Sequence, residues 1–147
     1  MSAKAQKQLY GVIPYKVEDD CVWVMMVTSQ TRKRWIFPNG NIEKGETGAQ
    51  AAAREAFEEA GVKGSIDKKH TIDAIIGKSA PDGIEDVSVE FFAMEVLKQA
   101  DKWPEKDERK RRWLTLDKAK SVIKDDDFKA VVTSFSKQKF VAKLVAA

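Results

Sequence analysis

Three carboxylates, Glu55, Glu58 and Glu59, lie within five consecutive positions of the sequence. On an α-helix, residues three and four apart share a face, so these side chains would span about 100° of one surface. Like charges at this spacing repel one another and raise one another's pKa. Divalent cations remove that cost, and oxygen ligands suit hard ions such as Mg2+ or Mn2+. The spacing therefore predicts a metal site on one face of a helix.

The residues around this cluster predict the helix that carries it. Thr47 and Gln50 have the spacing of a capping box, and Gly61 suits the position just after the helix C-terminus. The alanines between them favour helix. The predicted apolar face, opposite the carboxylates, consists of Ala49, Ala53, Ala56, Phe57 and Ala60. Small side chains on that face favour close packing against a sheet.

Residues 40–62 resemble the Nudix box, a pattern of the form Gly-x5-Glu-x7-Arg-Glu-U-x-Glu-Glu-x-Gly-U in which U is apolar. The matching positions are Gly40, Glu46, Arg54, Glu55, Ala56, Glu58, Glu59, Gly61 and Val62. The resemblance implies an α/β protein with the Nudix fold, a three-layer α/β/α sandwich with a mixed sheet and a loop-helix-loop box. It also implies hydrolysis of a phosphoanhydride bond with Mg2+ as cofactor, or with Mn2+ in its place.

The resemblance also assigns roles to the box residues. Glu55 and Glu59 match metal ligands, and Glu58 matches either a ligand or the catalytic base. The carbonyl of Gly40 is a further candidate ligand, because a glycine lets the backbone approach an ion closely. The choice of base among the glutamates stays open.

Two more box residues match a supporting role. Glu46 lies in the loop before the helix and Arg54 lies beside the acidic face. A guanidinium can orient carboxylates while it offsets their charge. Glu46 and Arg54 are therefore expected to brace the loop against the helix and to assist catalysis from there.

Sequence outside the box narrows the resemblance. Residues 34–38, 60–64, 103–105 and 109–113 are similar to diphosphoinositol polyphosphate and diadenosine polyphosphate hydrolases. The chain departs from that subfamily at Pro38-Asn39-Gly40-Asn41, where a glycine-rich stretch is common. The implied substrate is a small phosphorylated molecule, favoured as a dinucleoside polyphosphate or a diphosphoinositol polyphosphate.

Arginines near the box are candidates for binding such a substrate. Alternation along a strand would direct Arg109 and Arg111 the same way, and arginine binds phosphate in a bidentate manner. Arg34 lies close to the box loop and is the third candidate. The alternative for the run around Arg109 is a solvated charged loop, because acidic residues are interspersed with it.

Two other polar residues leave alternatives open. Glu90 lies in an apolar strand pattern, where it is either a remote metal ligand or a solvent-facing side chain. His70 is the only histidine and follows two lysines, which favours a surface loop over a catalytic role.

Length, composition and net charge indicate the class of protein. A length of 147 residues suits a single domain over residues 1–147, and 43% hydrophobic with 33% charged residues is typical of a soluble protein. The net charge of +3 is modest, so nucleic acid is an unlikely partner. A membrane-spanning stretch and a secretory signal are not evident, and the single cysteine fits a reducing cytoplasm. The oligomeric state cannot be inferred.

The pattern of apolar residues predicts strands and helices in mixed order. Strands are expected at residues 8–15, 21–28, 35–37, 70–77, 87–97 and 113–115, and helices at the box, at 117–123 and at about 126–145. Polar residues 78–86 and 99–108 are expected to be loops, and the acidic run 125–127 to cap the last helix.

Two other functions remain open from the sequence. One is a nucleoside-triphosphate or RNA 5'-pyrophosphohydrolase. The other, of a different class, is a non-catalytic nucleotide-binding module. The clustered carboxylates argue for catalysis, because a protein that only binds has no need of a repulsive cluster. A solvated acidic helix face is the simplest structural explanation of such glutamates, but it does not account for the spacing of the loop residues.

Overall fold

A mixed sheet of seven strands runs through the protein. The computed structural model describes residues 7–144. The strands are β1 (Gln8–Glu18), β2 (Cys21–Thr28), β3 (Trp35–Ile36), β4 (Asn39–Gly40), β5 (Val62–Ala80), β6 (Gly83–Gln99) and β7 (Arg111–Thr115). Their main order is β3-β2-β1-β6-β5, with β4 paired to β1 and β7 paired to β2. β1 and β6 are parallel, whereas the other paired strands are antiparallel.

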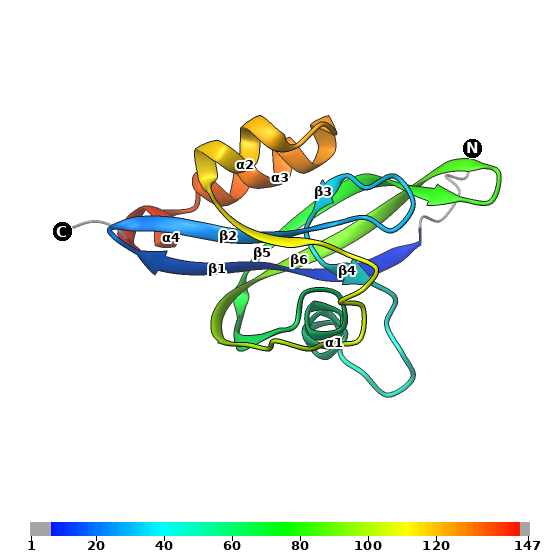
Figure 1. Cartoon of the computed structure of the whole chain (residues 1–147), viewed down its shortest axis with the longest axis horizontal. Helices are drawn as coiled ribbons and strands as arrows, with labels where there is room; N and C mark the ends of the chain where they lie inside the picture. The colour runs from blue at the N-terminus through cyan, green and yellow to red at the C-terminus, as the bar shows by residue number, and fades with distance from the viewer. Residues whose placement is uncertain (1–6, 145–147) are drawn as a thin grey trace.

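Helices cover both faces of this sheet. They are α1 (Gly48–Ala60), α2 (Leu116–Val122), α3 (Asp126–Ser136) and α4 (Lys139–Leu144). α1 lies on one side of the sheet and α2 and α3 lie on the other (Figure 1). This arrangement confirms the predicted α/β class with three layers. No helix within residues 7–144 is both long and apolar enough to cross a membrane.

The core lies on both faces of the central strands. Val12 and Ile13 are adjacent in β1 and both are buried, at 0% and 1% exposure. Consecutive buried residues are expected where helices cover both sides of a strand. α3 contributes Phe128, Val131, Val132 and Phe135 to the core, which lie on one face of the helix.

The segment predicted as a loop at residues 78–86 is instead the tip of a hairpin. β5 and β6 pair as far as Ala80 and Gly83, with a turn at Pro81-Asp82 between them. The polar composition was misleading because pairing satisfies the backbone whatever the side chains are, and most side chains here are exposed. β5 therefore reaches past Ile76 and carries Lys78 on a strand.

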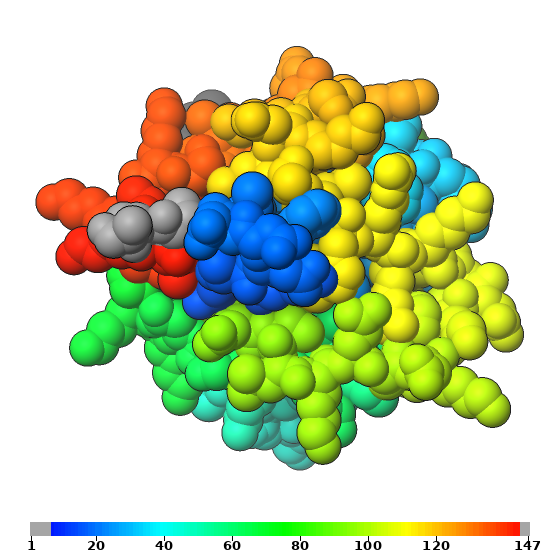
Figure 2. Space-filling view, turned by 60° about the vertical axis from the view of Figure 1, so that its left-hand side comes forward, coloured from blue at the N-terminus to red at the C-terminus, as the bar shows by residue number. Residues whose placement is uncertain are grey.

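The final helix is also shorter than predicted. The expected helix at about 126–145 is divided into α3 and α4 at residues 137–138. The break turns Phe140 inward, where its ring lies 6.2 Å from that of Tyr15 and 4.2 Å from that of His70. His70 thus belongs to strand β5 and not to a surface loop. Figure 2 shows α4 beside the β1–β2 turn at this end of the molecule.

Candidate active site

Both ends of α1 are fixed by local hydrogen bonds. The backbone N–H of Gln50 donates to Thr47 Oγ1 at 3.2 Å, and the N–H of Thr47 donates to Gln50 Oε1 at 2.9 Å. Gly61 ends the helix with φ at 68°, a conformation that glycine adopts without strain, and its N–H donates to Phe57 O. The predicted capping box and C-terminal glycine are confirmed. These caps fix where the helix begins and ends, and thereby the direction in which each carboxylate points from it.

The buried face of α1 is rotated from the predicted one. Its buried residues are Ala51, Ala52, Ala56, Glu59 and Ala60, whereas Phe57 is only half-buried and packs beside Lys63. The helix packs mainly on β1, β5 and β4, and the segment after β6 contacts its C-terminal end. Glu105 N donates to Glu58 O at 3.0 Å and Trp103 Nε1 donates to Glu59 O at 3.1 Å. Glu59 is therefore covered by chain that is distant in sequence.

Arg54 joins the loop before α1 to the acidic face. Its Nε lies 2.8 Å from Glu46 Oε2, and its Nη2 donates to Asn41 O at 2.8 Å. Its Nη1 lies 3.2 Å from Glu55 Oε1 and 3.4 Å from Glu58 Oε2. The expected contact between Glu46 and Arg54 is present. Arg54 also supplies a countercharge within the carboxylate cluster itself.

Burial changes the ionisation of two carboxylates. Glu59 is 4% exposed, and desolvation, opposed by Arg109 and reinforced by Glu55, raises its pKa to about 8. Burial likewise raises the pKa of Glu55 to about 7, with Arg54 opposing and Glu58 adding to the shift. Both shifts favour the protonated forms of Glu55 and Glu59, whereas a bound cation would favour their ionised forms.

The donor set suits a hard divalent ion. Three glutamates offer oxygen ligands only, and the raised pKa values of Glu55 and Glu59 show that their ionised forms lack sufficient positive charge nearby. The backbone of Gly40 adjoins this set, since a Cβ there would lie 1.4 Å from Glu55 Oε2. Within residues 7–144 no three acidic, His or Cys side chains already converge on one ion position. Arg54 holds Glu55 and Glu58 instead, so an ion would compete with its guanidinium.

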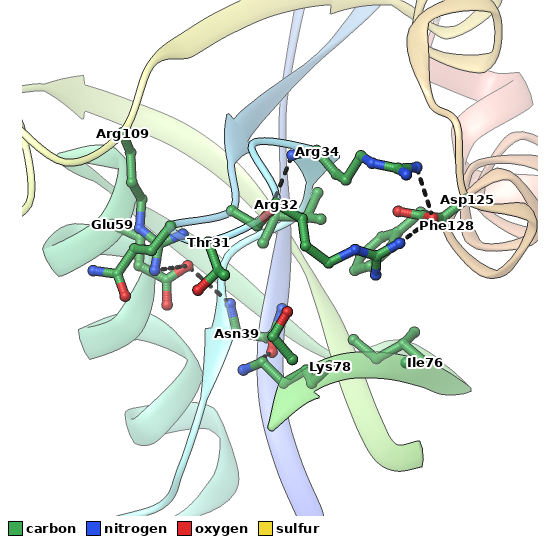
Figure 3. A pocket seen from close by; sticks show the side chains of 15 residues that line it. Thr31, Arg32, Arg34, Asn39, Glu59, Ile76, Lys78, Arg109, Asp125 and Phe128 are labelled. Carbon is green, nitrogen blue, oxygen red and sulfur yellow. Dashed lines mark hydrogen bonds and ion pairs between the residues drawn. The ribbon is translucent and has the colours of Figure 1, made fainter. Parts of the chain in front are cut away.

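A cavity of about 180 Å3 opens beside Glu59. Four cations line it, from three different segments of the chain: Arg32, Arg34, Lys78 and Arg109. Figure 3 shows Glu59 and Arg109 at one end of this cavity and Asp125 with Phe128 at the other. The cavity thus places a carboxylate of α1 next to a set of groups that favour an anionic ligand.

Arg109 and Arg34 both line the cavity. Arg109 is 10% exposed at its side chain, and its Nη2 lies 3.9 Å from Glu59 Oε1. Arg34 Nη1 lies 3.1 Å from Asp125 Oδ1, at the opposite end. Asp125 precedes α3 but makes no side-chain capping bond, so the predicted capping role is wrong for this residue. Its carboxylate is held by arginines instead.

Arg111 lies elsewhere. Its Nη1 donates to Ala60 O at 2.9 Å, its Nη2 donates to Ala100 O at 2.7 Å, and its guanidinium stacks on Trp103 at 3.8 Å. Arg109 and Arg111 both reach toward α1, as alternation suggested, but at different places. The predicted substrate contact is not supported for Arg111, because its donors are used by backbone carbonyls at the end of α1.

Lys78 and Asn39 lie in the cavity but were missed by sequence reasoning. Lys78 Nζ donates to Asn39 Oδ1 at 2.8 Å. Burial lowers the pKa of Lys78, while the charges of Glu59 and Glu55 oppose that shift. Alternation with Ile76 is the sequence signal that places Lys78 here, and the polar composition of residues 78–86, which predicts a loop, conceals it. Glu90 lies opposite Asp73 on β5, and its role as a ligand stays a prediction.

Comparison with known proteins agrees with this geometry. The model of the NUDIX domain matches residues 9–134. Nudix hydrolase 4 of Arabidopsis thaliana is 31% identical over 92% of this chain and 68% of its own length. Diphosphoinositol polyphosphate phosphohydrolase 3-beta of Bos taurus is 28% identical over 80% of this chain and 69% of its own.

A solved structure extends the likeness to the fold. A binary complex of the Ap4A hydrolase of C. elegans superposes with a TM-score of 0.71 at 19% identity, covering 93% of this chain and 98% of that one. At this identity the match concerns the fold alone. Together with the match of the domain model, the box residues on α1 lead to one assignment. The chain belongs to the Nudix hydrolase family.

Proposed function

We propose that this protein is a Mg2+-dependent hydrolase that cleaves a phosphoanhydride bond in a nucleoside-linked polyphosphate. One observation carries the proposal. Glu59 belongs both to the carboxylate cluster of α1 and to the wall of the cation-lined cavity. A phosphate chain bound in that cavity would lie beside the cluster. Proximity of this kind is what in-line attack by water requires.

The residues divide into two groups by role. Glu55, Glu59 and either Glu58 or the Gly40 carbonyl would hold the ion, which supplies neutralisation of phosphate charge and activation of water. Glu58 has 34% of its side chain exposed and is the most accessible of the three carboxylates. It is therefore the best placed to accept a proton from water if it is not a ligand.

Arg109 belongs to the second group and would bind the phosphates. Its side chain lines the cavity near Glu59, and its charge complements an anionic chain. Hydrogen bonds from such a group hold the substrate in one orientation and do not themselves take part in bond cleavage. Loss of Arg109 is expected to affect substrate affinity more than metal binding.

The cavity favours a nucleoside over an inositol at its far end. Ile36, Ile76 and Phe128 are apolar residues that line the cavity, and Phe128 lies at its far end beside Asp125. A nucleobase has apolar faces that suit such a surface, whereas a phosphorylated inositol has none. Arg32 and Arg34 are already bound to Asp125, so fewer free charges are available for additional phosphates. A dinucleoside polyphosphate is the substrate we favour.

A substrate panel tests the proposal. Diadenosine tetraphosphate, a diphosphoinositol polyphosphate, ATP, ADP-ribose and 5'-triphosphorylated RNA are compared by kcat/KM, with Mg2+ and with excess chelator. We expect Mg2+-dependent turnover with the highest value for diadenosine tetraphosphate. Highest turnover of ATP or RNA would support the alternative pyrophosphohydrolases. Binding without turnover of any substrate would support the non-catalytic module and overturn the proposal.

A further inference from the structure

Lys78 is held in the cavity by the strand that carries it. Two residues earlier in β5, Ile76 is 1% exposed, and alternation directs Lys78 to the same side of the strand. Between them, Gly77 N donates to Asp127 Oδ2 at 2.9 Å, which ties β5 to the first turn of α3. Figure 3 shows Lys78 on β5, facing Asn39. The ammonium group is therefore positioned by the fold before any ligand binds.

Asn39 determines where that ammonium group points. Asn39 is 3% exposed, and its Nδ2 donates to Phe37 O at 2.9 Å. This contact leaves Oδ1 as the atom that faces Lys78, at 2.8 Å from Nζ. The direct partner of the lysine is thus a neutral amide oxygen. An ammonium group has three N–H donors, so two are available for other acceptors.

Lys78 differs from the other cations of the cavity in its lack of a carboxylate partner. The others are paired, Arg32 and Arg34 with Asp125, and Arg109 with Glu105 at 2.7 Å. No carboxylate within residues 7–144 lies at ion-pair distance from Lys78 Nζ. A largely buried cation without a counter-ion is costly, because desolvation is not offset by direct attraction.

We propose that Lys78 is a phosphate-binding residue whose counter-ion is a phosphate group of the substrate, with Asn39 orienting its ammonium group. The inference rests on the proposed function for the chemical class of the ligand. It adds a residue outside the Nudix box, supplied by the β5–β6 hairpin. Affinity for a phosphate chain is thereby linked to the hairpin end of β5, the end that lies farther along the chain from α1.

The test uses imidodiphosphate, in which nitrogen replaces the bridging oxygen so that binding is measured without hydrolysis. Calorimetric titration with Mg2+ present compares wild type with Lys78→Met, Lys78→Arg and Lys68→Met. Lys68 is an exposed residue of the same strand and serves as the matched control. We expect Kd to rise by on the order of 10- to 100-fold for Lys78→Met. Lys78→Arg keeps the charge and should stay within several-fold of wild type, and Lys68→Met should match wild type.

Melting temperature without ligand separates a binding role from a structural one. Lys78→Met removes a buried cation that has no carboxylate partner, which should stabilise the fold, but it also removes the donor to Asn39 Oδ1. The two effects oppose each other, so the melting temperature of Lys78→Met should stay close to that of Lys68→Met. A clear loss of stability, unchanged affinity, or absence of imidodiphosphate binding by wild type would each overturn the proposal. If the proposed function is wrong, the result is different: imidodiphosphate binding still depends on Lys78, but the protein hydrolyses no member of the substrate panel.

Discussion

Arg54 and Glu46 form a two-point contact across eight residues of sequence. Arg54 Nε lies 2.8 Å from Glu46 Oε2, and Arg54 Nη2 lies 3.0 Å from Glu46 Oε1. The third nitrogen of the guanidinium, Nη1, lies near the carboxylates of Glu55 and Glu58 on α1. A single planar group therefore ties the loop before α1 to the acidic cluster. It also holds the carboxylate of Glu55, which lies next to Gly40.

The first prediction concerns this planar group. Lysine in place of Arg54 keeps the charge but offers one nitrogen, which cannot bind Glu46 and the α1 carboxylates in the same geometry. We expect Arg54→Lys to lower kcat by about 10-fold or more through misplaced carboxylates. The measurement is steady-state kinetics at saturating Mg2+. Lys44→Met, an exposed change in the same loop, is the control, and equal activity of the two variants would contradict the prediction.

The second prediction concerns the buried carboxylate. Glu59→Gln keeps the shape of the side chain but removes a charge from the cluster, so kcat should fall by about 100-fold or more. Chelator should abolish the activity of wild type, and Mg2+ should restore it. Glu85→Gln, an exposed change in the β5–β6 hairpin, is expected to retain activity. Full turnover in excess chelator would contradict the metal dependence.

The third prediction concerns pH. The pKa of Glu59 is raised to about 8 and that of Glu55 to about 7 in the folded, metal-free protein, from 4.5. Because folding favours the protonated forms, their contribution to stability is fully present below about pH 4.5 and is lost as pH rises through 7 to 8. In chelator, we expect the melting temperature to fall between about pH 5.5 and pH 8.5.

Mg2+ and Glu59→Gln provide the controls for this pH effect. An ion replaces the protons, so the rise in melting temperature on adding Mg2+ should be larger at the higher pH. Glu59→Gln cannot ionise at this position, so its melting temperature should change less over the same range. A wild-type melting temperature that rises with pH in chelator would show that these carboxylates are not protonated in the fold.

The fourth prediction separates two arginines of the basic run. Arg109→Ala removes a cation from the cavity wall and should lower kcat/KM by about 10- to 100-fold. It also loses the bonds of Arg109 to Glu105 and to Thr28 O, so its melting temperature should fall as well. Arg111→Ala removes two hydrogen bonds to backbone carbonyls and should cost about 1–3 kcal/mol of folding free energy. Its melting temperature should then fall by several degrees while kcat/KM changes little. A larger loss of kcat/KM for Arg111→Ala than for Arg109→Ala would contradict the prediction and would favour Arg111 as the residue that contacts the substrate.

The parts of the site predicted from sequence are those set by local chemistry. The caps of α1 depend on Thr47, Gln50 and Gly61, which are neighbours of the helix they end. The contact of Arg54 with Glu46 also follows from spacing within a single motif. Such features need no knowledge of the strands around them, and each is present in the structure.

The parts that were missed depend on contacts between distant segments. Asn39 and Lys78 are 39 residues apart and meet only because β4 and β5 belong to one sheet. Glu59 is buried among residues distant in sequence, such as Asn39 of β4 and Arg109 after β6, and no helical pattern predicts which carboxylate of three will be covered. The polar tip of the β5–β6 hairpin concealed a strand, because backbone pairing leaves no trace in side-chain composition.

The contacts made by the segment after β6 also bear on which end of α1 forms first during folding. Backbone and side-chain donors at residues 103–111 bind the carbonyls of Glu58, Glu59 and Ala60, the last turn of α1. A chain that ends before residue 103 would leave these carbonyls to water and Glu59 uncovered. Contacts this distant in sequence form late, after the local caps at the start of the helix. The N-terminal turn of α1 can therefore form early, whereas the acidic end acquires its final environment only when most of the chain has assembled.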